Sequence, residues 1–134
     1  MTPFHLKIVT PDGLIFDGQA EELIVRASTG DVAILARHVN YVTSLGMGRA
    51  VVIADGQRRT AACIGGMLSV VDGEVTLVPT TFEWADQIDL GRAEVSYQRA
   101  DKVLKDKDST ATDLALAEAR LHRALVRKSV ASYK

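Results

Sequence analysis

The feature that most constrains the fold of this chain is an abrupt change of sequence character at residues 88–93. Before it, short β-type runs alternate with turn dipeptides such as Asp55-Gly56 and Asp72-Gly73. From Arg92 to the end the sequence contains neither proline nor glycine, and its apolar residues recur with a helical period. The sequence therefore predicts a β-rich part followed by a helical part.

The β-rich part contains many short strands joined by tight turns. Asp-Gly pairs suit hairpins whose two central residues have positive φ, and Asp17-Gly18 is a further turn signal. Short strands at close spacing favour a sandwich or flattened barrel over a βαβ fold. We therefore expect a mainly β protein with a helical addition, in which residues 1–84 form a β-sandwich. The strands are expected at residues 4–9, 14–17, 20–27, 31–35, 41–45, 48–54, 58–64, 67–71 and 74–78.

The helical part, residues 85–134, predicts an antiparallel two-helix hairpin. Apolar residues spaced by four, three and four indicate one helix from Asp89 to about Lys105, with Asp86 or Asp89 as its cap. A charged segment follows, and a second helical stripe comes after it. Because these stripes are rich in alanine and poor in large apolar residues, the hairpin should be marginally stable. The stripes are Ala93, Tyr97, Ala100 and Leu104, and then Leu114, Ala117, Leu121, Ala124, Leu125 and Lys128.

Composition excludes several classes of function. The net charge of −1, which divides into −3 for residues 1–84 and +2 for residues 85–134, is too small for a nucleic-acid-binding protein. A single cysteine, Cys63, cannot form an internal disulfide. The longest apolar runs, residues 32–36 and 50–54, are far shorter than the roughly 18 residues of a membrane span. We expect neither nucleic-acid binding nor direct membrane insertion.

An enzymatic function finds no support in the motifs. The chain has no Gly-x-Ser-x-Gly nucleophile elbow, and His5, His38 and His122 lack metal-ligand spacing. Gly65-Gly66 is not followed by the Lys-Ser/Thr pair of a P-loop, so it predicts a turn or bulge. We therefore expect a non-catalytic protein that has no metal site and requires no cofactor.

Arginines are grouped on the two predicted helices. Arg120, Arg123 and Arg127 share one face of the second helix, while Arg92 and Arg99, seven residues apart, share a face of the first. If these faces meet, the resulting guanidinium cluster could bind phosphates through forked hydrogen bonds. The alternative is a solvated basic face with no ligand.

Ordered motifs along nearly the whole chain carry a resemblance to a known family. They are Leu6-Lys7-Ile8-Val9-Thr10-Pro11, Phe16-Asp17-Gly18, His38 with Val42-Thr43-Ser44-Leu45, Gly65-Gly66-Met67-Leu68-Ser69-Val70, Val75-Thr76-Leu77-Val78, Ile88-Asp89-x-x-Arg92-Ala93 and Arg123-Ala124-x-x-Arg127. In this order the motifs resemble those of the epsilon subunit of bacterial F-type ATP synthases.

The resemblance implies a role in the rotating central stalk of the synthase. The sandwich would bind the gamma subunit and the c-ring, and so couple ion flow to ATP synthesis. The hairpin would fold on the sandwich or extend towards the catalytic alpha and beta subunits and block ATP hydrolysis. The location implied is the cytoplasmic face of a bacterial cell membrane, as a peripheral subunit of the complex, and the absence of a transit peptide favours a bacterium.

The resemblance also implies candidate site residues. A regulatory ATP site would use Glu83, Ile88, Asp89, Arg92, Ala93, Arg99, Arg123 and Arg127. A region facing gamma or the c-ring would contain Gly30, Asp31, Arg37 and His38. Where the family usually has Pro-Gly before the histidine, this chain has Ala36-Arg37, so the turn there must be made differently.

Two other functions stay open at the level of sequence. One is a nucleotide-sensing module that acts alone and ignores the gamma subunit. The other is a purely structural coupling subunit whose hairpin neither extends nor binds nucleotide.

Overall fold

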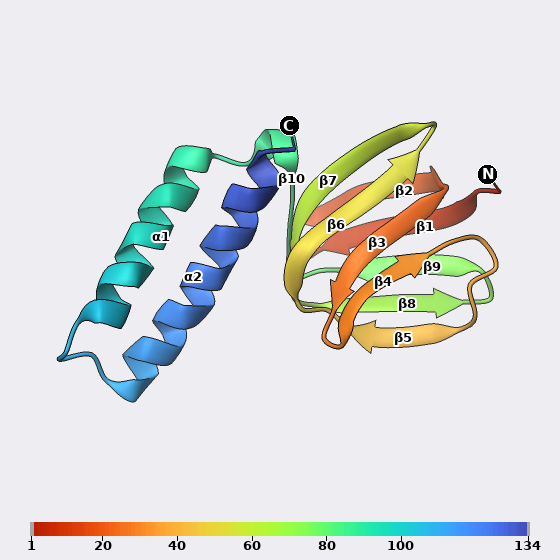
Figure 1. The fold of residues 1–134 in the computed structure, drawn as a ribbon. Helices are drawn as coiled ribbons and strands as arrows, with labels where there is room; N and C mark the ends of the chain where they lie inside the picture. Colours follow the sequence, from red (N-terminus) through yellow and green to blue (C-terminus); the bar gives the residue numbers. More distant parts are fainter. Residues whose placement is uncertain (1, 134) are drawn as a thin grey trace. The chain divides into compact units, whose positions relative to one another are not determined.

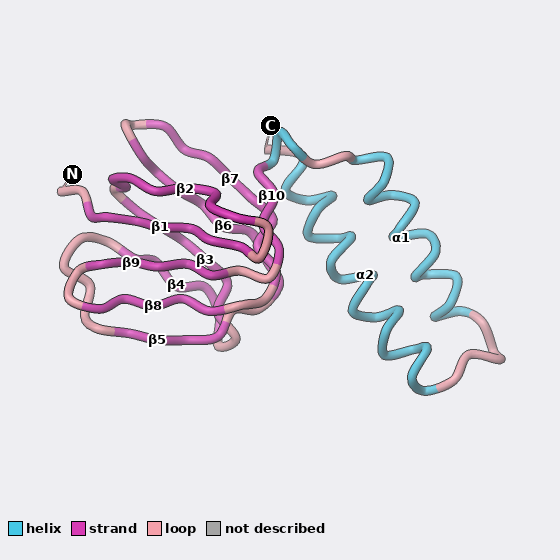
Figure 2. Tube along the Cα trace, turned by 180° about the vertical axis from the view of Figure 1, so that it is seen from behind, coloured by secondary structure: helices cyan, strands magenta, loops and turns pink. Residues whose placement is uncertain are grey.

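The computed structural model describes residues 2–133, which divide into two compact units at the Trp84–Ala85 bond. The first unit consists of strands and the loops between them, and the second consists of helices (Figure 2). This architecture confirms the predicted fold class, a β-sandwich followed by a helical hairpin. None of the helices in residues 2–133 combines the length and the apolarity needed to cross a membrane.

The first unit is a sandwich of two five-stranded sheets (Figure 1). One sheet has the order β2-β1-β9-β8-β5, in which β1 and β9 are parallel, and the other has the order β10-β7-β6-β3-β4. The strands are β1 (Phe4–Thr10), β2 (Gly13–Ala20), β3 (Glu22–Ala27), β4 (Gly30–Ile34), β5 (Tyr41–Ser44), β6 (Met47–Ala54), β7 (Gln57–Ile64), β8 (Met67–Val71), β9 (Glu74–Val78) and β10 (Thr81–Trp84).

Part of the sandwich core follows from alternation of buried and more exposed side chains, as on β1, whereas β6 and β7 bury runs of consecutive residues. On β1, Phe4, Leu6 and Ile8 are buried, while the side chains between them lie nearer to solvent. Burying alternate apolar side chains of two facing sheets is what holds such a sandwich together. Phe82 and Trp84 complete this core in a T-shaped contact with ring centroids 4.9 Å apart.

The turns behave largely as their residues predict. Asp55, Gly56, Asp72 and Gly73 all have positive φ, as a two-residue hairpin loop requires. The predicted turn at Asp17-Gly18 is wrong, because β2 runs without a break from Gly13 to Ala20 and its pairing with β1 outweighs the local turn preference.

The strand prediction also missed β10 (Thr81–Trp84), which pairs with β7. Gly65-Gly66 is a turn with φ of 67° and 95°. A Cβ at Gly66 would lie 2.0 Å from the carbonyl oxygen of Val78, so the close approach of the two backbones there requires glycine.

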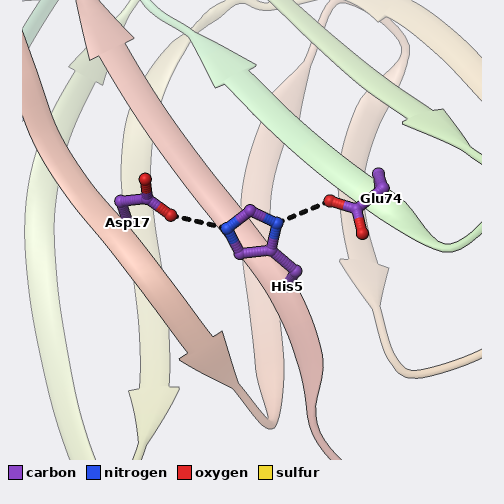
Figure 3. Close-up of polar contacts among 3 residues, drawn as sticks. All are labelled: His5, Asp17 and Glu74. Atoms are coloured by element: carbon purple, nitrogen blue, oxygen red, sulfur yellow. Dashed lines mark hydrogen bonds and ion pairs between the residues drawn. The ribbon is translucent and has the colours of Figure 1, made fainter.

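A polar link crosses three strands of the first sheet (Figure 3). The imidazole of His5 on β1 contacts Asp17 on β2 through Nε2 and Glu74 on β9 through Nδ1, each at 2.5 Å. Hydrogen bonds from the Asp17 and Glu74 carboxylates raise the pKa of His5 above its ordinary value. The protonated ring, which carries a donor on each nitrogen, is the form that satisfies both carboxylates.

The second unit begins with a short 3₁₀ turn, Ala85–Gln87, and continues as helices α1 (Leu90–Lys105) and α2 (Ala111–Ala131). Of the two predicted caps of the first helix, Asp89 is the N-cap, and its carboxylate accepts from the backbone N–H of Arg92 at 3.0 Å. Thr110 and Asp113 form a capping box at the start of α2. These caps fix where each helix begins.

Small side chains form the seam between α1 and α2. Ala93 and Ala100 on α1, and Ala117 and Ala124 on α2, are all buried, and each pair is seven residues apart. The seven-residue spacing keeps both pairs on one face of their helices. The predicted stripe on the second helix is wrong in part, because Leu114 and Leu125 are exposed. The alanine positions, rather than the leucines, define the inner face of α2.

An ion pair joins the two helices beside this seam. Lys128 Nζ lies 2.8 Å from Glu94 Oε2 and 4.5 Å from the centroid of the Tyr97 ring. The hydrogen bonds that Glu94 accepts from Lys128 and then Gln98 lower the pKa of its carboxyl group. Lys128 therefore links the last turns of α2 to the first turns of α1.

Candidate functional site

One cavity of the second unit lies between α1, α2 and the turn that joins them. Its volume is about 710 Å³. Four arginines, three aspartates, two serines and four apolar residues surround it. The lining residues are Ser96, Arg99, Ala100, Val103, Asp106, Asp108, Ser109, Asp113, Leu116, Ala117, Arg120, Arg123 and Arg127.

Helical periodicity explains why the arginines meet in one cavity. Successive residues turn by about 100° around an α-helix, so steps of three or four return to nearly the same face. Arg120, Arg123 and Arg127 form such a row on α2, and Arg99 on α1 lines the same cavity. The same geometry places Lys128 and Glu94 on the other side of the alanine seam, so the ion pair and the arginine row lie on opposite flanks of the hairpin.

Two of the four arginines that line the cavity lack a carboxylate partner among residues 2–133. Within residues 2–133, neither Arg99 nor Arg120 takes part in an ion pair or a side-chain hydrogen bond. Arg123 donates from Nε to the carbonyl oxygen of Ala119 at 3.5 Å, and this neutral acceptor does not balance the charge of the guanidinium group. Guanidinium groups gathered in this way favour an anion with several acceptor oxygens.

Two of the three aspartates that line the same cavity accept hydrogen bonds near the interhelical turn. Asp113 accepts from the backbone N–H of Thr110, and Asp106 accepts from the backbone N–H of Asp108 at 3.0 Å. Their carboxylates therefore stabilise the turn and the start of α2. The cavity is consequently basic along the arginine row and acidic at the turn.

The structure brings together part of the predicted ATP site. Arg99, Arg123 and Arg127 line the cavity. Ile88, Asp89, Arg92 and Ala93 lie at the start of α1, where Ile88 and Ala93 are buried and Arg92 is exposed. Glu83 is on β10 in the first unit.

Arg120 is the residue that the resemblance did not include, although the cavity contains it. The helical spacing of Arg120, Arg123 and Arg127 was the signal that identified it.

The predicted region facing gamma or the c-ring lies on and after β4 of the sandwich. Asp31 pairs with Arg26 Nε at 3.0 Å, and Gly30 has φ of 131°. The turn before His38 is made without Pro-Gly, because Arg37 adopts φ of 66° and the N–H of His38 donates to the carbonyl of Leu35 at 3.2 Å. Arg37 thus occupies a left-handed conformation that usually belongs to glycine.

Cys63 is inert in this structure. It is buried within the sandwich core, and burial raises the pKa of its thiol to about 12. A thiol that stays protonated at neutral pH is a poor nucleophile.

Comparisons with known proteins agree with this architecture. Residues 3–85 match the family model described as ATP synthase, Delta/Epsilon chain, beta-sandwich domain. Residues 86–132 match the model described as ATP synthase, Delta/Epsilon chain, long alpha-helix domain. The two matches meet within one residue of the boundary between the two structural units.

Bacterial relatives match over nearly their whole length. The chain is 42% identical over 135 residues to an ATP synthase epsilon chain of Ruminococcus albus, covering 100% of both chains. It is 40% identical over 131 residues to an ATP synthase epsilon chain of Bacillus velezensis, covering 98% of both.

Two solved structures share the fold at low sequence identity. A chain in the cryo-EM structure of the Euglena gracilis mitochondrial ATP synthase (OSCP, F1 and c-ring) matches with a TM-score of 0.85 at 19% identity. That match covers 100% of this chain and 83% of that one. A chain of the Tetrahymena thermophila mitochondrial ATP synthase central stalk and c-ring matches with a TM-score of 0.66 at 12% identity, covering 95% of both.

Proposed function

This chain belongs to the ATP synthase delta/epsilon family, among the bacterial epsilon chains, and we propose that it is a non-catalytic rotor subunit of the central stalk. The observation that carries the proposal is the pair of family matches, which together extend from residue 3 to residue 132. The sandwich binds the gamma subunit and the c-ring, and so couples ion-driven rotation to ATP synthesis. The subunit lies at the cytoplasmic face of a bacterial membrane through these partners.

In this proposal the hairpin is a conformational brake on ATP hydrolysis. The folded hairpin permits turnover, and the extended hairpin reaches the alpha and beta subunits of the catalytic head and stops it. The alanine seam supports the proposal, because burying methyl groups stabilises a helix pair much less than burying leucines. A weakly packed element is the kind that opens without unfolding the rest of a protein.

We further propose that ATP binds the folded hairpin and biases this equilibrium. The gathering of Arg99, Arg123 and Arg127 around one cavity supports a phosphate-binding role. A ligand present at about 100 times its dissociation constant stabilises the state it binds by roughly 2.7 kcal/mol. We expect Arg92→Ala combined with Arg123→Ala to abolish ATP affinity, and unchanged affinity in titration calorimetry would refute the site.

The rotor function is tested by ATPase turnover of an epsilon-depleted synthase head. The full-length chain and a fragment of residues 1–84 are added separately, and circular dichroism checks that the fragment is folded. We expect the full-length chain to slow turnover and the fragment to bind without slowing it. If the full-length chain and the fragment both bind and neither inhibits turnover, the coupling function remains supported and the brake is refuted.

A pull-down with isolated gamma subunit separates the rotor from a nucleotide-sensing module that acts alone. Retention of the chain on gamma supports the rotor function. Failure to bind gamma, together with ATP binding by the isolated chain, would favour the separate module.

A further inference from the structure

We propose that Arg120 binds the last phosphate of a bound triphosphate and so distinguishes ATP from ADP. This inference rests on the proposed nucleotide site and adds a residue to it. Arg120 is outside the set that the family resemblance supplies, yet it lines the same cavity as Arg99, Arg123 and Arg127.

The first argument is the extent of the arginine row. Arg127, Arg123 and Arg120 follow one another along α2 at steps of four and three residues. With a rise of 1.5 Å per residue, the backbone positions of the first and last are separated by about 10 Å along the helix axis. A row of that length matches a chain of linked phosphates better than a single phosphate.

The second argument is the charge of Arg120 itself. Among residues 2–133 it forms no ion pair and no side-chain hydrogen bond, although three aspartates line the same cavity. The nearest of them in sequence, Asp113, accepts the N–H of Thr110 in the capping box. The guanidinium of Arg120 is thus available to an anion, and such an anion would relieve its repulsion with Arg123.

The third argument is the direction of the row. The other hairpin residues carried over from the family, from Ile88 to Ala93, lie at the start of α1, which faces the end of α2 in an antiparallel pair. Arg120 is displaced from them towards the interhelical turn. If a nucleotide is held at the start of α1 and its phosphates follow the arginine row, its last phosphate reaches Arg120.

Beyond Arg120 the lining of the cavity changes sign, at Asp106 and Asp108. A phosphate chain therefore has favourable partners as far as Arg120 and repulsive ones after it. This arrangement would favour a triphosphate over longer chains.

The test is titration calorimetry on the full chain with ATP, ADP and inorganic tripolyphosphate. We expect Arg120→Gln to weaken ATP binding by about tenfold, the effect of losing one charge-assisted hydrogen bond, and ADP binding by less than about threefold. Arg120→Lys, which keeps the charge and loses the fork, should fall between wild type and Arg120→Gln. Lys102→Gln is the matched control, because it removes one positive charge from an exposed position of α1 that does not line the cavity.

Each outcome bears on a different claim. Equal loss of ATP and ADP affinity in Arg120→Gln, or no loss, overturns the proposal while the nucleotide site stands. Equal effects of Arg120→Gln and Lys102→Gln also overturn it, since they indicate general electrostatics. Binding of tripolyphosphate but not ATP by wild type would refute nucleotide sensing and leave a phosphate site, in which Arg120→Gln must still weaken tripolyphosphate. Binding of neither would refute both, and the turnover assay would still decide the rotor function.

Discussion

Overpacking the alanine seam should loosen the hairpin and leave the sandwich unchanged. Ala124 is 1% exposed and lies seven residues from Ala117 on the inner face of α2. Ala124→Leu adds three carbon atoms where the two helices approach closely. We expect the folded hairpin to lose about 1–3 kcal/mol, the usual cost of inserting methylenes into a packed interior.

Hydrogen exchange on the full chain measures this effect directly. At one power of ten per 1.4 kcal/mol, protection of the amides in α1 and α2 should fall by roughly fivefold to a hundredfold. Amides in the core strands of the sandwich should keep their protection, because that unit has its own hydrophobic core.

The matched control is Ala115→Leu on the same helix. Ala115 is exposed, so the same chemical change should alter hairpin stability by no more than about 0.5 kcal/mol. The reasoning would be refuted by equal losses of protection in the two variants. A gain of protection in Ala124→Leu would refute it as well, because the seam would then contain unfilled space.

Three further predictions concern the turn after β4, the start of α1 and the His5 link. Arg37→Gly should raise the free energy of unfolding of the sandwich by about 0.5–1 kcal/mol in urea titrations, because φ of 66° strains an arginine; a decrease would contradict this. Gly91→Ala should stabilise the hairpin by up to about 1 kcal/mol and raise the hydrogen-exchange protection of the α1 amides, because Gly91 is helical. The added Cβ would meet nothing nearer than Asp89 Oδ1 at 3.4 Å. Unchanged protection would count against this prediction. Because the pKa of His5 is raised, its link to Asp17 and Glu74 stabilises the folded sandwich fully below about pH 6.5, and this stabilisation is lost as the pH rises through the raised pKa. Asp17→Asn should lower the pKa of His5 in an NMR titration. An unchanged pKa would refute the link.

Sequence reasoning was most successful where a local rule and the global fold agree. The Asp-Gly turns and the burial of Ala93 and Ala100 follow from residue type and period. It failed where pairing outweighed a local signal. Asp17-Gly18 is extended because β1 lies beside it, and β10 exists because β7 offers an edge for Thr81–Trp84.

The candidate site shows the same limit. Helical spacing placed three arginines on one face of α2, but spacing on one helix cannot show that Arg99 of the other helix joins them. Nor could the sequence show that Asp106 and Asp113, whose carboxylates accept backbone N–H groups at the interhelical turn, would line the same cavity as the arginines. Both facts depend on how two helices are positioned against each other.

The two flanks of the hairpin differ in their electrostatics, and under the proposed function this asymmetry would let a ligand influence folding of the hairpin. On one flank, the Lys128–Glu94 ion pair favours the closed hairpin. On the other, four arginines converge on one cavity, and closing the helices brings these like charges together. The seam of methyl groups between the two flanks contributes little to the stability of the closed hairpin. Under the proposed function, an anion in the cavity would therefore favour the closed state, and its loss would shift the balance towards opening without any change in the sandwich.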